Sequence, residues 1–529
     1  MQMLRRAAIV LLGGSVWLGL AATPASAISI GPGNIEIVNP SQFNLVIGAD
    51  NTTVYSDLNF VIGNGNGTWF SDGNTVFAND TLLWESDSNN ITGDSNTLYF
   101  SNYNDVSGFG NYFDDAWYND VSGDFNYLAN VADSNTVSGS FNYLNNSSGN
   151  VVSGHFNGLE YSDFNTVSGN SNWLYDSSFN NVSGFANYLG NAWGNDVSGD
   201  FNYLANFADF NDVSGSFNYL YNSSFNDVSG SFNDLEYSDF NTVSGNSNWL
   251  YDSSFNNVSS DGNWLWGSDF NTVSGDFNGL DGASFTYVSG EGNYISGGFN
   301  WVTGDWNTVV GDSNDVYGDN NWLYNVTGNT VFGDNNNAYA GGGAATLSGN
   351  VFWGDGASVA SYNGATVANN HFGDDVNVYA NGPGASVSSN SLWNGASAYA
   401  YAFTGSAVVE NNYVNGDSSV QAWAFNGSTA TATGNTVYGD LNTVYVYASN
   451  PSIASSAQAV GNYINGNANY LYSAASHNGS ATSTSYNLVL NDSNSLYSWS
   501  TGDGSVVTTD FNCVNGSDAF FNSSSNWSC

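Results

Sequence analysis

The sequence predicts an all-β fold: a narrow β-solenoid with two strands per coil of about 15 residues, continuing into a wider β-helix with three strands per coil and a disulfide-stapled C-terminal cap. Three observations predict it. Asparagine recurs with a fixed rhythm, proline is absent from residues 41 to 382, and the asparagine spacing lengthens after residue 341. Proline would remove a ladder hydrogen bond from a central strand, so its absence favours continuous strand pairing.

Residues 1–27 have the features of a secretory signal peptide. Arg5 and Arg6 precede an apolar run, and a small-residue cleavage site ends at Ala27. The apolar run is too short for a good membrane span, and no later segment is long and apolar enough for one. We therefore expect a bacterial protein that is secreted or displayed at the cell surface, whose mature chain starts with an N-terminal cap at residues 28–43.

Residues 44–340 form the predicted narrow solenoid. Between residues 135 and 202, asparagine returns at alternating intervals of seven and eight, and Val or Leu follows each asparagine two positions later. Because strand side chains alternate with period 2, Asn165 and Val167 share one face and point inward together. Inward asparagines about 4.8 Å apart can pass amide hydrogen bonds from coil to coil. We therefore interpret these asparagines as structural rather than as a ligand site.

Residues 341–512 form the predicted wider β-helix. Landmarks of the form N-x-[VIL] or N-x-[FYW] now recur 20 to 27 residues apart, and each is followed by two alternating runs, which predicts three strands per coil. Residues 513–529 form the predicted cap. An even pair of cysteines in an exported protein is usually a disulfide, so we expect Cys513 and Cys529 to be joined over the last coil.

The narrow solenoid is expected to present two different outward faces. Large rings lie beside the Leu strand and form the candidate face for a ligand or for another copy: Tyr127, Tyr143, Trp173, Tyr188, Tyr203, Tyr219, Trp249 and Trp264. Hydroxyl side chains lie beside the Val strand and form the alternative, an ice-binding face: Thr136, Ser138, Thr166, Ser168, Thr242, Ser244, Thr272 and Ser274. Phenylalanines that directly precede asparagine, such as Phe141 and Phe225, are expected to stack at the corners of the coils.

The charge balance restricts the partners. The two arginines of the predicted signal peptide are the only Lys or Arg residues against 46 Asp and Glu, and the formal net charge is −44. Nothing in the mature chain can neutralise phosphate or sulfate, which excludes nucleic acid, heparin-like chains and anionic lipid membranes as electrostatic partners. The expected partners are a glycan or other copies of the chain, in a homo-oligomer or fibre.

Catalytic motifs are absent from the sequence. His155, His371 and His477 are scattered, and neither G-x-S-x-G, H-E-x-x-H nor a P-loop occurs. Polysaccharide lyases with a β-helix fold use Arg or Lys against an acidic sugar, and the mature chain has neither, so we predict a non-enzymatic protein. No cofactor is expected. The G-D-x-N turns resemble those of calcium-binding β-rolls but lack the G-G-x-G-x-D spacing, which leaves Ca²⁺ as the one candidate.

The N-x-V-x-G-x-x-N-x-[VL] unit resembles the short β-roll repeats in the heads of trimeric autotransporter adhesins, and more loosely the coils of other bacterial β-solenoid surface proteins. The resemblance covers residues 44–336 and is best between Asn293 and Asn321, where the interval is a steady seven. The chain departs from those heads in using Asn where they often have Ser or Ala. The resemblance implies an extracellular adhesive or structural role.

Three functional hypotheses follow. The first is a secreted, non-enzymatic structural or adhesive protein whose aromatic face contacts a glycan or another copy. The second is an ice-binding protein, because Thr-x-Ser pairs place hydroxyls about 6.6 Å apart along a strand and about 4.8 Å apart between coils. Carboxylates at Asp196, Asp212 and Asp227 interrupt that array, which favours the first hypothesis. The third is a polysaccharide-active enzyme.

Overall fold

The computed structural model describes residues 27–30, 36–38, 44–47, 52–54, 59–63, 65, 67–70, 72–325, 327–340, 346–354, 356, 358–362, 366–426, 429–450, 455–476, 480–491, 494–501, 506–510, 512–514, 520–521 and 526–527. Within these residues every helix or strand is a β-strand, from β1 (Ala27–Ile30) to β67 (Asn526–Trp527). The chain divides into two compact units, Met1–Ser253 and Ser254–Cys529. The predicted signal peptide lies outside the described residues except for Ala27.

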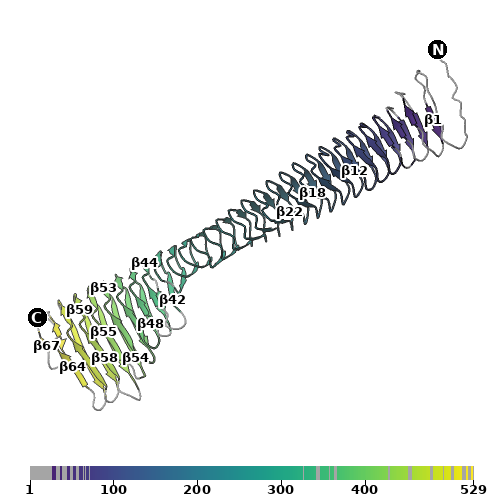
Figure 1. The fold of residues 1–529 in the computed structure, drawn as a ribbon. Coiled ribbons are helices and arrows are strands. Elements are labelled where there is room, and N and C mark those ends of the chain that lie inside the picture. The colour runs from purple at the N-terminus through teal and green to yellow at the C-terminus, as the bar shows by residue number, and fades with distance from the viewer. Residues whose placement is uncertain are drawn as a thin grey trace. The chain divides into compact units, whose positions relative to one another are not determined.

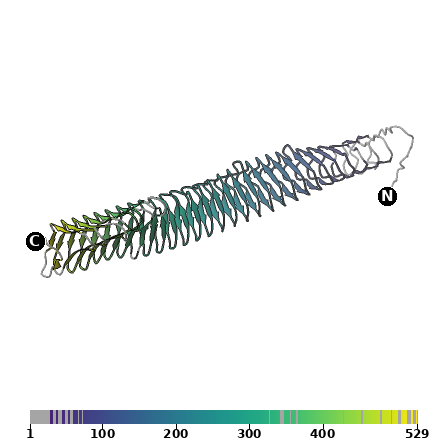
Figure 2. The same ribbon diagram turned by 90° about the horizontal axis from the view of Figure 1, so that it is seen from below.

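In the first unit, short parallel strands alternate between two sheets, as β12 (Tyr112–Asp114), β18 (Gly158–Glu160) and β22 (Tyr188–Gly190) illustrate for one of them (Figures 1 and 2). Sheet A holds the Val strands, such as β17 (Val151–Ser153) and β19 (Thr166–Ser168), which pair in parallel. Sheet B holds the Leu strands, such as β18 and β20 (Trp173–Tyr175), which also pair in parallel. The predicted narrow solenoid with two strands per coil is confirmed.

The core of each narrow coil consists of one residue from each sheet and the asparagines at the corners. Val167 of sheet A and Leu174 of sheet B are completely buried, and Asn165 and Asn172 are buried beside them. Three-residue strands with the pattern exposed, buried, half-buried leave only the central side chain for the interior. So thin a core gains little from apolar burial alone, and hydrogen bonds to the buried amides are needed to offset the cost of their burial.

The asparagine ladder provides hydrogen bonds for these buried amides. The Oδ1 atom of Asn180 accepts hydrogen bonds from the backbone N–H of Asn165 at 2.7 Å and from its Nδ2 at 3.1 Å. The Nδ2 of Asn165 also donates to the carbonyl oxygen of Ser162 at 2.7 Å. The amide of Asn165 therefore joins two successive coils and closes its own corner, whereas the buried Nδ2 atoms of some other ladder residues, such as Asn142 and Asn218, have no hydrogen-bond partner among the described residues. The structural interpretation of the asparagines is confirmed.

The second unit begins with narrow coils and gains a third sheet. Its narrow strands include β31 (Asn257–Ser259), β32 (Trp264–Trp266) and β33 (Thr272–Ser274). Sheet C starts at β43 (Thr346–Ser348), so the predicted widening to three strands per coil is confirmed. The remaining strands of sheet C are β46 (Thr366–Ala368), β49 (Ala385–Ser388), β52 (Ala407–Glu410), β55 (Thr429–Thr433), β58 (Ser456–Val460), β61 (Ala481–Ser485) and β64 (Val506–Asp510).

Sheet B becomes broad in the three-sheet part. Its strands there include β48 (Asn377–Asn381), β51 (Ser397–Ala402), β54 (Ser419–Phe425), β57 (Thr443–Ser449), β60 (Tyr470–Ser476) and β63 (Ser495–Thr501). Buried and half-buried residues alternate along β54 and β57, and small residues such as Ala422 and Ala448 point inward. The asparagine ladder continues here, with Asn435 Nδ2 donating to Asn462 Oδ1 at 3.0 Å.

At the two ends, the described strands bear on the predicted boundaries. β1 pairs with β3 (Asn44–Ile47), and β2 (Glu36–Val38) pairs with β4 (Thr52–Val54), so paired strands already occur within the segment predicted as an N-terminal cap. At the other end, Cys513 lies in β65 (Asn512–Val514). Cys529 lies outside the described residues, and its disulfide with Cys513 stays a prediction.

Candidate binding surfaces

The register of sheet B brings the predicted aromatic residues of the first unit into one column. Tyr127 pairs with Tyr143, Tyr188 with Tyr203, and Tyr203 with Tyr219. The Tyr127 and Tyr143 ring centroids are 5.2 Å apart with planes at 4°, and those of Tyr203 and Tyr219 are 5.1 Å apart at 3°. Trp173 and Trp249 lie in the same column, and Trp264 occupies the same place in the repeat within the second unit.

The column extends further towards the N-terminus than the sequence analysis proposed, and it has two gaps. Tyr112, which is not among the residues predicted for this face, stacks on Tyr127 at 5.3 Å. The gaps are at Gly158 and Asp234, which pair with Tyr143 and Tyr219 but carry no aromatic ring. Next to these gaps, the hydroxyl groups of Tyr143 and Tyr219 donate to the carboxylates of Glu160 and Glu236. Burial and these carboxylates raise the pKa of both phenols, which remain neutral donors at physiological pH.

Phenylalanines form two further columns, one at each corner of the narrow coil. At the corner that leads into sheet B, Phe201, Phe217 and Phe232 stack with centroids 4.9 and 5.0 Å apart and planes within 8°. At the corner that leads into sheet A, Phe210 and Phe225 stack at 5.0 Å and 7°. The predicted stacking at the corners is confirmed.

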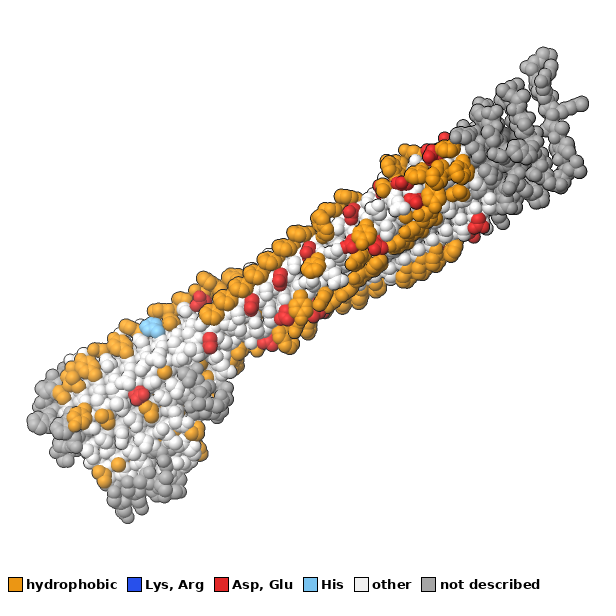
Figure 3. Space-filling model, viewed as in Figure 1, with side chains coloured by type: hydrophobic (Ala, Val, Ile, Leu, Met, Phe, Trp, Pro, Cys, Tyr) orange, Lys and Arg blue, Asp and Glu red, His pale blue; other side chains and the backbone are white. Residues whose placement is uncertain are grey.

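These phenylalanines are also exposed, which the sequence did not predict. Phe217, inside a stack, is 47% exposed, and Phe164, at the start of one, is 65% exposed. Hydrophobic side chains accordingly form rows that run from coil to coil in Figure 3. The reason is the backbone: each corner phenylalanine has a positive φ, 60° at Phe217, which turns its side chain away from the interior. These exposed apolar rows are therefore the candidate contact surface of the narrow coils.

The predicted ice-binding residues lie on the outer face of sheet A. Thr136, Thr166 and Thr242 are exposed in the first unit, with Ser138, Ser168 and Ser244 half-buried beside them. Thr272 and Ser274 have the same positions in the second unit. In the register, however, Asp196, Asp212 and Asp227 stand next to one another in the threonine column. The hydroxyl array is therefore interrupted by three adjacent carboxylates.

This carboxylate column predicts a pH dependence of stability. Asp212 is largely exposed, and partial desolvation together with the charges of Asp196 and Asp227 raises its pKa above the ordinary value. The folded chain thus binds this proton more tightly than the unfolded chain, so its contribution to stability rises as the pH falls through the raised pKa towards about 4. We expect Asp212→Asn to raise the free energy of unfolding at pH 7 by less than about 1 kcal/mol, because the group is exposed, and to have no effect below pH 4.

Urea denaturation of the wild type and of Asp212→Asn between pH 4 and pH 7.5 measures this difference. Asn181→Asp, which adds a carboxylate to the same column beside Asp196, is the matched control and is expected to act in the opposite direction. A difference between Asp212→Asn and the wild type that does not vary with pH would contradict the prediction.

The histidines and the G-D turns take part in contacts between coils. His155 Nδ1 accepts from the backbone N–H of Asn170 at 3.0 Å, and the ring of His371 lies between those of Trp353 and Trp393. His477 lies outside the described residues. The carboxylates of the turns accept backbone N–H groups of the next coil, as Asp200 does from Ser216, Asp276 from Glu291, Asp312 from Thr327 and Asp319 from Asp334.

The described residues contain neither clustered metal ligands nor a membrane-spanning helix. No three His, Cys, Asp or Glu side chains among them are grouped closely enough to hold a metal ion. No helix in these parts of the chain is long and apolar enough to cross a membrane. The prediction of a non-enzymatic protein rests on the sequence argument and stays a prediction.

No protein-family model matches the chain, and no curated protein matches it. Among solved structures, a mutant of the PL6 family alginate lyase AlyGC is similar over 89% of this chain and 97% of its own, with 8% identity and a TM-score of 0.17. The leucine-rich repeat ectodomain of the receptor kinase GASSHO1/SCHENGEN3 from Arabidopsis thaliana covers 88% of this chain and 85% of its own, with 10% identity and a TM-score of 0.15.

The pentapeptide repeat protein HetL from the cyanobacterium Nostoc is similar over 50% of this chain and 83% of its own, with 15% identity and a TM-score of 0.07. Such low TM-scores and identities carry no inference about the function of this chain.

Proposed function

We propose that this protein is a secreted, non-enzymatic structural or adhesive protein of a bacterial surface or extracellular matrix, and that its stacked aromatic columns bind further copies of the chain. The observation that carries the proposal is the set of half-exposed corner phenylalanines in stacks, such as Phe201, Phe217 and Phe232. The extracellular location rests on the predicted signal peptide.

The geometry of the stacks favours another copy over a glycan at this surface. Rings that lie about 5 Å apart and nearly parallel cover one another's faces, so the row presents ring edges to solvent. A sugar needs a free ring face on which to stack. Phenylalanine also offers no hydrogen-bonding group for sugar hydroxyls. A second row of ring edges from another copy can instead pack between these edges and bury apolar area from both sides.

Charge makes this association dependent on salt. Two mature chains, each with 46 Asp and Glu residues and no Lys or Arg, repel each other, and the repulsion reaches about 10 Å at 0.1 M salt but only about 3 Å at 1 M. We therefore expect sedimentation velocity to detect assembly that strengthens as the salt concentration rises. Wild-type protein that stays monomeric from 0.05 to 1 M salt would contradict the proposal.

Substitution of the rings tests which surface associates. We expect Phe201→Ser, Phe217→Ser and Phe232→Ser together to weaken association at least about tenfold. Serine fits here because Ser171 and Ser247 hold the same corner in other coils with φ of 58° and 61°. The sheet B set Tyr188→Ser, Tyr203→Ser, Tyr219→Ser, Trp249→Ser and Trp264→Ser is expected to act in the same direction.

The matched control changes the opposite face. Thr166→Asn, Thr242→Asn and Thr272→Asn alter the hydroxyl column of sheet A, where Asn181 already occupies one position, and are expected to leave association unchanged. Association that is lost with the threonines and kept without the rings would transfer the function to sheet A. Thermal hysteresis that disappears with the threonines would replace the proposal by ice binding.

A further inference from the structure

The outer face of broad sheet B differs chemically from the rest of this acidic chain. The chain contains 46 Asp and Glu residues, yet β51, β54, β57, β60 and β63 contain none. Their outward positions instead hold aromatic and neutral polar side chains, among them Gln421, Trp423, Tyr445, Tyr470, Tyr472 and Tyr497. This neutral aromatic face has up to four outward side chains on a strand, as in β54 and β57, whereas the three-residue sheet B strands of the narrow coils have two.

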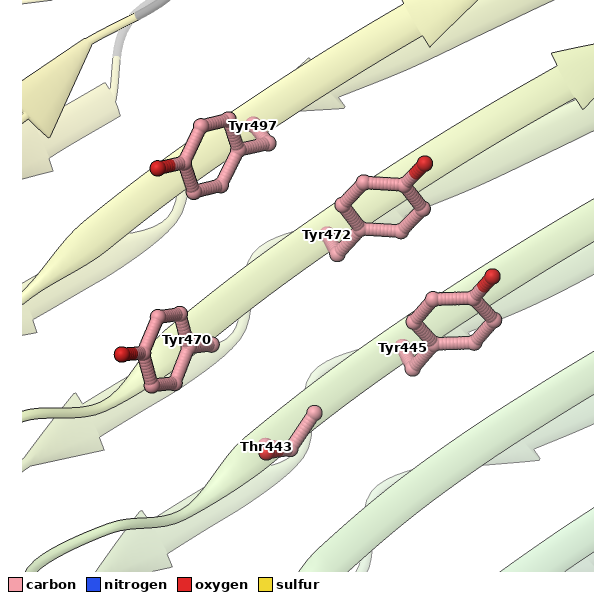
Figure 4. A pocket seen from close by; sticks show the side chains of 5 residues that line it. All are labelled: Thr443, Tyr445, Tyr470, Tyr472 and Tyr497. Carbon is pink, nitrogen blue, oxygen red and sulfur yellow. The ribbon is translucent and has the colours of Figure 1, made fainter.

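A hollow opens where the rings of this face stop stacking. Tyr445 and Tyr472 stack at 4.8 Å and 4°, but Tyr472 and Tyr497 are 6.4 Å apart with planes at 52°. Beside these rings lies a hollow of about 290 Å³, which is lined by Thr443, Tyr445, Tyr470, Tyr472 and Tyr497. Figure 4 shows these side chains on three neighbouring strands, β57, β60 and β63.

Hydrogen-bonding groups lie around the rings. The hydroxyl of Tyr470 belongs to a side chain that is 47% exposed, and Thr443 contributes a hydroxyl beside it. In the two coils that precede β57, Ser419 Oγ of β54 donates to Tyr399 Oη of β51 at 3.1 Å, and Trp423 Nε1 donates to Gln421 Oε1 within β54 at 2.9 Å. Burial and the neighbouring phenols raise the pKa of Tyr445 to about 12, so its hydroxyl stays neutral. The face therefore offers apolar ring surface edged by uncharged donors and acceptors.

We propose that this face binds a neutral polysaccharide, with one or two sugar rings held in the tyrosine-lined hollow. A pyranose ring has an apolar C–H face and a rim of hydroxyls, which matches ring carbons surrounded by uncharged polar groups. The hollow, at about 290 Å³, is just smaller than the range of about 300–1,000 Å³ for small-molecule sites, as expected for a site that holds a short stretch of a long chain. An acidic sugar would meet the strongly negative chain, whereas a neutral sugar meets a surface free of carboxylates.

Calorimetric titration of the full chain tests this proposal with four probes. These are hexasaccharides of β-1,4-linked glucose, β-1,4-linked N-acetylglucosamine and α-1,4-linked glucose, and hexagalacturonate as the acidic comparison. We expect at least one neutral hexasaccharide to bind and hexagalacturonate not to bind. Wild-type protein that binds none of the neutral probes, or that prefers the acidic one, would overturn the proposal.

Two substitutions use residues that the fold already accepts at the same places. Tyr470→Ser copies Ser495, its partner in β63, and Tyr472→Gln copies Gln421, which shares its column. Each is expected to weaken binding at least about tenfold, while Tyr470→Phe, which keeps the ring, retains most of the affinity. Phe403→Ser, which removes an exposed ring outside the strands of sheet B, is the matched control and should change nothing.

Unchanged binding in both tyrosine variants would refute this site even if the protein bound a glycan elsewhere. Self-association is measured separately through the corner phenylalanines, so failure of either proposal leaves the other intact. If Tyr470→Ser reduced self-association instead of glycan binding, the neutral aromatic face would be a contact between copies.

Discussion

Gly169→Ala is expected to open the narrow solenoid around its coil and to lower the free energy of unfolding by more than about 3 kcal/mol. A Cβ atom on Gly169 would lie 1.8 Å from the carbonyl oxygen of Gly154 and 2.7 Å from its carbonyl carbon. Both are backbone atoms of the preceding coil, and parallel strands on each side hold that coil in place. The φ of Gly169, +117°, adds strain for any residue with a side chain.

Gly110→Ala is the matched control. Its φ is also positive, at +72°, but a Cβ atom there would meet nothing within 4 Å. Phe125 occupies the same corner one coil later with φ of 62°, so the fold accepts a side chain at this place. We expect a change of about 1 kcal/mol or less. Guanidinium denaturation measures both free energies of unfolding. Similar losses for the two variants would show that the close approach of Gly169 to the preceding coil does not require glycine there.

Asn180→Ala is expected to lower the free energy of unfolding by about 3 kcal/mol. The substitution removes the Oδ1 atom that accepts the backbone N–H and one Nδ2 hydrogen of Asn165. The buried backbone N–H then has no acceptor, while Nδ2 keeps its bond to the carbonyl oxygen of Ser162. Each unsatisfied buried donor costs about 1–3 kcal/mol. Because a solenoid is stabilised through neighbouring coils, hydrogen exchange should accelerate first at the amide of Asn165 and at the adjacent strands.

Asn181→Ala is the control for this substitution. Asn181 follows Asn180 directly, but its side chain is exposed on the outer face of sheet A. Because its backbone N–H still donates to the carbonyl oxygen of Asn165, the ladder around it is preserved. We expect a change within about 0.5 kcal/mol. Equal losses for Asn180→Ala and Asn181→Ala would mean that the side-chain ladder contributes no stability.

The sequence alone was sufficient for the narrow coils, their two sheets and the inward asparagines. In a solenoid with a fixed repeat, equivalent residues of successive coils lie above one another. Two asparagines one repeat apart, such as Asn165 and Asn180, are therefore expected to be in contact. The same rule placed Tyr203 above Tyr219. The change to three sheets was also predictable, because a longer interval between asparagines must contain another strand.

Only the tertiary structure decided which rings are exposed and how they face. Corner phenylalanines such as Phe217 point outward because their backbone has positive φ, a property that hydrophobicity alone does not reveal. Tyr445, Tyr472 and Tyr497 stand in one column although 27 and 25 residues separate them, because the coils differ in length and only strand pairing sets their register. The sequence by itself thus determined the repeating core, because residues one repeat apart in the sequence are in contact in the fold. The neutral aromatic face depends on register between unequal coils and on ring orientation, which only the folded chain defines.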